Sequence, residues 1–138
     1  MNILKPAFST WIPWNNREDF NNLDGVGVYL LASFDRPPAG KASPNVREII
    51  YVGETCLQNF RCRWRQFDNS AFRGKHGHSG GRTYADVIGG KGANLFVAAC
   101  CCSDLQANIR SFFVRYLERK LIWNYIARHG QPPKCNRK

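Results

Sequence analysis

The sequence predicts an α+β domain in which helices flank a small, three-stranded antiparallel sheet, in the order β-β-α-β-α. Short runs rich in Val, Ile, Leu and Ala are bounded by Gly and Pro, which indicates strands. Two later segments change to the apolar spacing of helices. The 138 residues, 43% of them hydrophobic, suffice for one domain with a buried core.

Residues 1–24 contain the aromatic, Pro-interrupted stretch FSTWIPW and are predicted to be an arm or short helix that packs on the domain. The domain itself spans residues 25–138. Residues 25–33, GVGVYLLAS, form its first strand, and residues 48–54, EIIYVGE, form its second. The turn-rich connection FDRPPAGKASPN predicts that these two strands pair as an antiparallel hairpin.

The next segment, residues 57–67, has helical periodicity. Four apolar residues share one face at spacings i, i+3, i+7 and i+10, namely Leu57, Phe60, Trp64 and Phe67. Residues 68–92 are rich in Gly and basic side chains and are predicted to be a loop with at most one short helical turn.

The remaining elements are a third strand, ANLFVAACC at residues 93–101, and a long helix over about residues 104–129. Ser103 or Asp104 is expected to cap the start of this helix, and Gly130 to end it. The sequence QPPKCNRK then closes the chain as an extended tail.

The net charge of +10 is distributed unevenly. Residues 1–54 carry a charge of −1 and residues 55–138 a charge of +11. This asymmetry favours a polyanionic partner, most simply nucleic acid, and a basic surface without a specific partner is the alternative.

No apolar run approaches the roughly 20 residues that cross a bilayer, so no membrane association is expected. The N-terminus has no basic start followed by an apolar stretch, so no secretory leader is expected either. The six cysteines include three consecutive ones in a predicted strand and no C-x-x-C pair. This pattern favours reduced, buried thiols and a cytoplasmic protein.

Glu118 is the only acidic residue after Asp104, and it stands among Arg115, Arg119 and Lys120. One interpretation is a salt bridge to a neighbouring arginine. The other is a ligand for Mg²⁺ or a similar hard cation, which binds one or two carboxylates and keeps several waters.

Two tyrosines and the arginines of residues 57–67 also admit two interpretations. Tyr29 and Tyr51, each taken alone, are typical of core aromatics with a satisfied hydroxyl. The arginines are typical of a solvated basic face, or they could bind a phosphate group.

Considered together, these residues form a pattern. Gly27, Val28 and Tyr29 form a GVY tripeptide, and Tyr51, Val52 and Gly53 form a YVG tripeptide on the next predicted strand. A helix arginine, a carboxylate on a later helix and an asparagine near the end follow. Over about residues 25–138 the chain therefore resembles the GIY-YIG nuclease superfamily.

The resemblance implies that Tyr29 and Tyr51 face one active-site surface, with Gly27 and Gly53 allowing close approach of backbone or phosphate. The sequence RWRQF looks like the Arg-x-x-x-His helix of the family. This makes Arg63 the expected catalytic arginine, with Arg61 as the second candidate.

Glu118 matches the metal-binding glutamate of the family, and Asn136 matches its C-terminal asparagine. The departure is Phe67, which stands where the family has histidine and cannot transfer a proton. His76 or His78, from the neighbouring loop, could replace that histidine, or could simply be solvated.

The resemblance implies metal-dependent hydrolysis of DNA, with Mg²⁺ or Mn²⁺ as cofactor, in-line attack by water and departure of the 3′ oxygen. Tyr29 would activate the water, with assistance from Tyr51 or a loop histidine. Arg63 would stabilise the phosphate, and Glu118 would hold the ion. Six basic residues would contact the nucleic acid: Arg61, Arg65, Arg73, Lys75, Arg82 and Lys91.

An inactive nucleic-acid-binding module with the same fold is the main alternative, and a protein-interaction domain is the third. Specificity would come from the N-terminal arm, from residues 68–92 or from a partner in a homodimer. A compact restriction enzyme is the expected role, with a repair or mobile-element nuclease as the other options.

Overall fold

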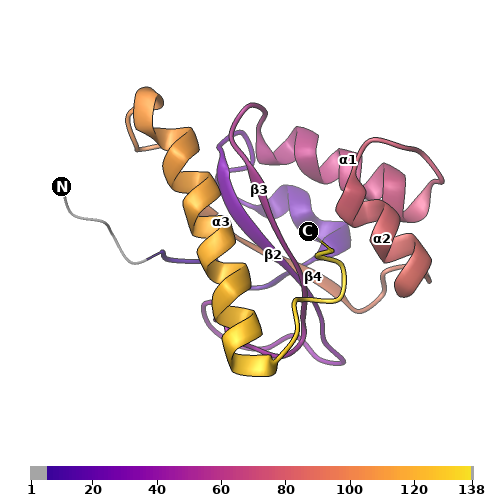
Figure 1. The fold of residues 1–138 in the computed structure, drawn as a ribbon. Coiled ribbons are helices and arrows are strands. Elements are labelled where there is room, and N and C mark those ends of the chain that lie inside the picture. Colours follow the sequence, from indigo (N-terminus) through magenta and orange to yellow (C-terminus); the bar gives the residue numbers. More distant parts are fainter. Residues whose placement is uncertain (1–5, 138) are drawn as a thin grey trace.

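The computed structural model describes residues 6–137; the expectations for residues 1–5 and 138 lie outside this range. The predicted α+β class is confirmed (Figure 1). The sheet has four antiparallel strands, one more than predicted, in the order β1-β4-β2-β3.

Three strands match the predicted ones: β2 (Gly27–Ser33), β3 (Ile49–Thr55) and β4 (Leu95–Cys101). Strands β2 and β3 form the expected antiparallel hairpin. The additional strand is β1 (Ile12–Pro13), which pairs with β4 at the sheet edge and is followed by a 3-10 helix, Trp14–Asp19. Two residues that include a proline leave too little alternation to predict a strand.

Helix α1 spans Phe60–Phe72, and the side chain of Asn59 caps its start by accepting a hydrogen bond from the Cys62 amide at 2.9 Å. Phe60, Trp64 and Phe67 are buried on one face as predicted. Leu57, predicted on the same face, is 88% exposed and precedes the helix, so that part of the prediction is wrong.

The prediction of a loop over residues 68–92 is also wrong. Helix α1 continues to Phe72, and a further helix, α2, spans Ser79–Val87. Its start contains Gly80 and Gly81, which weaken helix propensity in an isolated peptide. Both glycines are buried in the fold, because α2 packs on α1 and on β3.

Helix α3 spans Ala107–His129 and ends, as expected, at Gly130 with a left-handed φ of 85°. Its start lies later than predicted. Gln106 occupies the N-cap without a side-chain hydrogen bond, and the Ser103 hydroxyl instead accepts a hydrogen bond from the Val26 amide at 3.1 Å.

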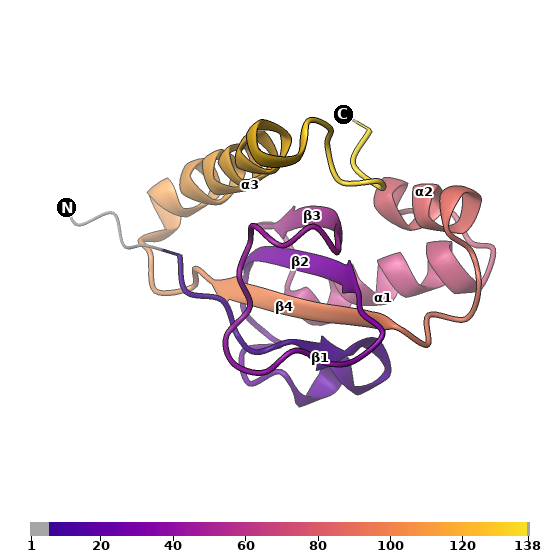
Figure 2. The same cartoon turned by 90° about the horizontal axis from the view of Figure 1, so that it is seen from below.

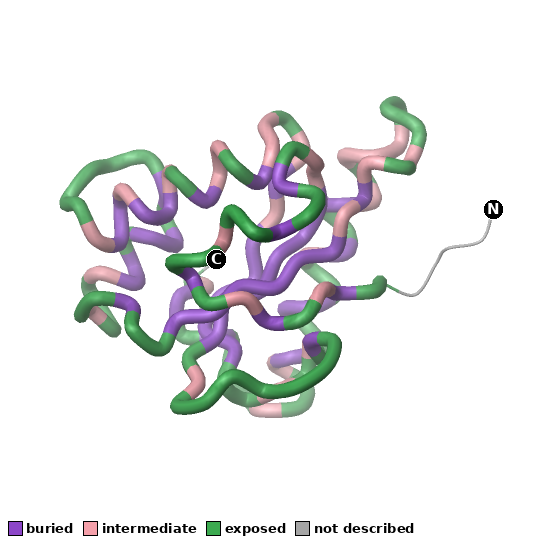
Figure 3. The backbone as a smooth tube through the Cα atoms, turned by 180° about the vertical axis from the view of Figure 1, so that it is seen from behind, coloured by how far each residue is buried: buried purple, intermediate pink, exposed green. Residues whose placement is uncertain are grey.

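The sheet is the middle layer of the fold, with α3 on one face and α1 and α2 on the other (Figure 2). Successive side chains of β2 point to opposite faces of the sheet and belong to two separate hydrophobic cores. Val28 and Leu30 face α3, and Tyr29 and Leu31 face α1. The strands form the buried centre of the chain (Figure 3).

Strand β3 is the second edge of the sheet, and the C-terminal segment covers it. The Cys135 amide donates to the Ile50 carbonyl at 2.8 Å, and the Asn136 side chain bonds to the backbone of Val52. An exposed edge would otherwise leave unpaired backbone groups available to another chain.

Within residues 6–137, no helix combines the length and apolar character that crossing a membrane requires. The six cysteines carry free thiols.

Candidate active site

Two phenols, Tyr29 from β2 and Tyr51 from β3, meet on the face of the sheet that carries α1. Their ring centroids are 6.0 Å apart. Tyr29 pairs in register with Gly53, and Tyr51 with Leu31, so the two rings are diagonal neighbours. A bulge at Ile50 adjusts the register here. Both rings therefore lie on the same face of the sheet.

The Tyr29 ring leaves no room for a side chain at position 53, so this position requires glycine. A Cβ atom at position 53 would overlap the ring of Tyr29 and lie 2.6 Å from its hydroxyl oxygen. The space expected to admit a backbone or a phosphate at Gly53 is therefore filled by the phenol. Gly27 does allow close backbone approach, because a Cβ there would overlap the carbonyl oxygen of Cys100.

His78 reaches the phenols from the start of α2. Its Nε2 lies 3.0 Å from the Tyr29 hydroxyl oxygen, and its Nδ1 accepts a hydrogen bond from the Gly81 amide at 3.1 Å. A backbone N–H can only donate, so the neutral ring carries its proton on Nε2 and donates it to Tyr29. The His78 ring lies edge-on to the Phe67 ring, with centroids 5.2 Å apart, so the imidazole is beside the position where the resemblance implies a histidine.

Burial governs the protonation of these groups. It raises the pKa of Tyr29 well above its usual range and that of Tyr51 to about 12. Burial, with the nearby charge of Arg63, lowers the pKa of His78 to about 3. At neutral pH the imidazole and both phenols are therefore uncharged.

Arg63 is the arginine that belongs to this cluster. Besides burial, its charge acts on the pKa of Tyr29, Tyr51, His78 and Glu118. Its Nη1 also donates to the Gln66 side-chain oxygen at 3.0 Å, which holds the guanidinium on α1.

Arg61, the second candidate, lies outside the cluster. Its Nε contacts Asp24 at 3.2 Å, and its Nη1 lies 4.0 Å from Glu18, both exposed carboxylates. Arg63 stands two positions after Arg61, and a helix turns by about 200° over that interval. This rotation directs the two side chains to different sides of α1.

Glu118 approaches β3 from α3, on the other side of the sheet edge. Burial raises its pKa to about 7, and the nearby carboxylate of Glu54 adds to the rise, while Arg119 and Arg63 oppose it. Glu54 follows Gly53 in β3, and its Oε2 is buried without a hydrogen-bond partner among the described residues. Two carboxylates therefore lie close enough to influence each other.

Glu54 is the residue that sequence reasoning missed. It stands directly after the YVG tripeptide, and strand alternation places it on the face opposite Gly53, toward α3. That alternation could have paired it with Glu118, had the position of α3 been known.

Asn136 uses its amide to hold the backbone of β3. Its Oδ1 accepts a hydrogen bond from the Val52 amide at 2.8 Å, and its Nδ2 donates to the Val52 carbonyl at 2.9 Å. In this arrangement Asn136 acts on the site by fixing the strand between Tyr51 and Gly53.

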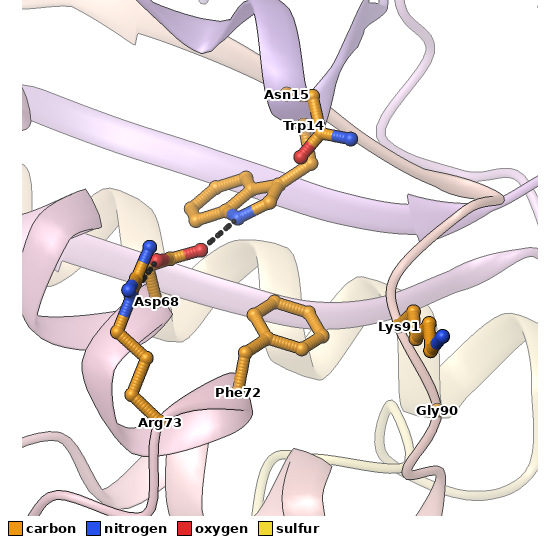
Figure 4. A pocket seen from close by; sticks show the side chains of 7 residues that line it. All are labelled: Trp14, Asn15, Asp68, Phe72, Arg73, Gly90 and Lys91. Atoms are coloured by element: carbon orange, nitrogen blue, oxygen red, sulfur yellow. Dashed lines mark hydrogen bonds and ion pairs between the residues drawn. The ribbon is translucent and has the colours of Figure 1, made fainter.

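The six residues expected to contact nucleic acid are exposed and spread over α1, α2 and the loops around them. Arg73 and Lys91 line a separate pocket of about 290 Å³ (Figure 4). In it Asp68 accepts hydrogen bonds from the Trp14 indole at 2.8 Å and from Arg73 at 3.1 Å. His76, like these cations, is exposed and lies apart from the buried His78.

Searches against protein-family models, curated proteins and solved structures gave no match to this chain.

Proposed function

We propose that this protein is a metal-dependent nuclease that hydrolyses phosphodiester bonds of DNA at the edge of β3. The observation that carries the proposal is the position of Arg63, whose charge acts on two phenols and a carboxylate at once. A fixed guanidinium among such groups suits a phosphate that gains negative charge during hydrolysis. The GVY and YVG tripeptides and the uneven basic charge support the same function.

Glu118 and Glu54 are the residues that would hold Mg²⁺ or Mn²⁺. The orphaned Oε2 of Glu54 and the mutual influence of the two carboxylates fit a hard cation, which binds one or two carboxylates and retains waters. Residues 6–137 contain no cluster of three or more His, Cys, Asp or Glu side chains suited to an ion. When bound, the ion would supply Lewis-acid stabilisation of the leaving oxygen.

His78 and the two phenols are neighbours in the site. His78 donates from Nε2 to Tyr29, and the Tyr29 ring centroid lies 6.0 Å from that of Tyr51. Tyr29 is fully buried, whereas Tyr51 is 8% exposed. We therefore assign the contact with the attacking water to Tyr51, and assign to Tyr29 and His78 the support of its oxygen.

This assignment differs from the sequence hypothesis, in which Tyr29 activates the water and Tyr51 or a loop histidine assists it. The Nδ1 lone pair of His78 is already engaged by the Gly81 amide, so the ring has no free acceptor for a proton. Arg63 would bind the phosphate, and Asn136 would keep β3 in place.

The test is cleavage of plasmid DNA with Mg²⁺ or with EDTA, using Arg63→Ala and Arg61→Ala as a matched pair on the same helix. Nicked or linear product that needs Mg²⁺, that is lost in Arg63→Ala and that persists in Arg61→Ala supports the proposal. Equal cleavage by Arg63→Ala and wild type would overturn it.

A nucleic-acid-binding module without turnover is the second candidate. Phe67 in place of histidine and the engaged lone pair of His78 favour it, because neither side chain can take a proton. Retarded mobility of DNA in a gel, without any metal-dependent product, would establish this alternative.

A further inference from the structure

Three aromatic side chains lie exposed along α3. Phe112, Tyr116 and Trp123 are 73%, 54% and 65% exposed. Spacings of four and seven residues place them on one side of the helix. Val114 and Leu121 on the other side are buried against the sheet, over which α3 lies in Figure 2. The aromatic row therefore points away from the core.

Cationic side chains of α3 alternate along the sequence with these aromatic residues. Arg115, Arg119 and Lys120 are exposed, and the Lys120 Nζ lies 5.9 Å from the centre of the Tyr116 ring. Over Ala107–His129 the helix carries five Lys or Arg residues and one acidic residue, Glu118. The outer side of α3 thus combines aromatic surface with positive charge.

A groove of about 280 Å³ adjoins Trp123, between α3 and the C-terminal segment. Apolar surface dominates its lining, which includes Trp123, Ile126 and Pro132 as well as the cations Arg119 and Arg137. Asn136 also lines this α3 groove, and its amide holds Val52, the neighbour of Tyr51. The α3 groove therefore borders the strand that carries the candidate active site.

We propose that the outer side of α3 and the α3 groove bind an unpaired segment of a nucleic acid strand. Its bases stack on Trp123 and Tyr116, and its phosphates contact Arg119, Lys120 and Arg137. Exposed aromatic rings interleaved with cations are the surface that unpaired bases and their backbone need, because every base has a face that can stack. The inference rests on the proposed action on nucleic acid and specifies a substrate with a single-stranded segment.

Charge favours this occupant over a second copy of the chain. Two copies meeting through α3 would bring Arg115, Arg119 and Lys120 against their own equivalents, which costs free energy between like charges. The phosphates of a nucleic acid complement the same residues.

Trp123 provides the reporter for the test. The other tryptophans, Trp11, Trp14 and Trp64, are at most 7% exposed. In EDTA, without cleavage, wild-type protein is titrated with an oligothymidylate of about ten nucleotides, which lies within the usual site sizes of single-strand binders. We expect quenching of tryptophan emission and protection from acrylamide. An abasic strand of equal length, which has the phosphates without the bases, should produce neither.

Trp123→Ala should weaken oligothymidylate binding roughly five- to 150-fold, in line with the loss of one stacked base. Val87→Ala, which truncates a 48% exposed side chain on α2, is the matched control and should bind like wild type. The inference is overturned if Trp123→Ala binds normally or if the abasic strand quenches equally. It is likewise overturned if the emission responds to self-association or to anionic lipid vesicles instead of the oligonucleotide.

Because this readout is binding in EDTA, it is independent of turnover. Stacking on Trp123 without Mg²⁺-dependent product would leave the inference standing and refute the nuclease. Plasmid cleavage without the change in Trp123 emission would support the nuclease and refute the inference.

Discussion

The ring of Tyr29 occupies the space that a side chain at Gly53 would take. The two residues pair directly across β2 and β3, and a Cβ at position 53 would lie 2.6 Å from the Tyr29 hydroxyl oxygen. The YVG tripeptide thus carries glycine because the GVY tripeptide carries a tyrosine opposite it. The first prediction follows from this contact.

Gly53→Ala should lower the free energy of unfolding by about 1–3 kcal/mol, because the added methyl group overpacks a buried site. Chemical denaturation measures the change. Tyr29→Leu removes the hydroxyl and the far end of the ring, so Gly53→Ala should cost much less in that background. Equal costs in the two backgrounds would show that the Tyr29 ring is not the obstacle.

His78 should make the protein sensitive to acid. Burial and the charge of Arg63 lower its pKa from 6.5 to about 3. Between pH 3 and pH 6.5 the unfolded chain therefore binds a proton at His78 that the folded chain does not. The contribution to stability is complete above pH 6.5 and is lost as the pH falls toward 3.

His78→Asn keeps an N-cap residue for α2 but removes the imidazole. The difference in melting temperature between wild type and His78→Asn should therefore change as the pH falls from 6.5 toward 3. A difference that stays constant over this range would contradict the burial of a neutral His78.

Glu118 should have the opposite pH dependence. Burial and the charge of Glu54 raise its pKa from 4.5 to about 7, so the folded chain holds a proton that the unfolded chain has released. This contribution to stability is complete below pH 4.5 and is lost as the pH rises through about 7.

Without metal, the melting temperature of Glu118→Gln should therefore rise relative to that of wild type as the pH increases from 4.5 through about 7. Mg²⁺ should raise the melting temperature of wild type above that range and raise that of Glu118→Gln less, because only wild type retains both carboxylate ligands. An equal response of both proteins to Mg²⁺ would remove Glu118 from the metal site.

Asn136→Ala should expose the role of the C-terminal segment. The variant leaves the buried Val52 amide without its partner, at a cost of about 1–3 kcal/mol. Hydrogen exchange at the Val52 amide should accelerate more than at amides of β2. Lys134→Ala, which alters an exposed side chain of the same segment, should leave both values unchanged. Unaltered exchange at Val52 in Asn136→Ala would show that the hydrogen bonds of the Asn136 side chain do not hold the Val52 backbone.

Local patterns predicted the elements whose structure depends on local residues. The apolar runs within residues 25–33 and 48–54 match β2 and β3, and Gly130 ends α3 because it adopts a left-handed conformation. The apolar spacing of Phe60, Trp64 and Phe67 marks the buried face of α1.

The failures share a different origin. Strand β1 exists because two residues find a partner in β4, and α2 exists because Gly80 and Gly81 fit against Tyr51 and α1. Neither partner is near in the sequence, and glycine disfavours a helix unless such packing compensates. Local reasoning therefore missed strand β1 and predicted a loop where α2 lies.

The sequence by itself determined the α+β class, the hairpin with its two tyrosines, and the set of residues from which a site could be built. Only the tertiary structure decided which of them meet: Arg63 and not Arg61, His78 and not His76, and Glu54 beside Glu118. The reason is physical. Element type follows from neighbours along the chain, whereas protonation and contact depend on groups that packing brings from distant positions into a shared, poorly solvated space.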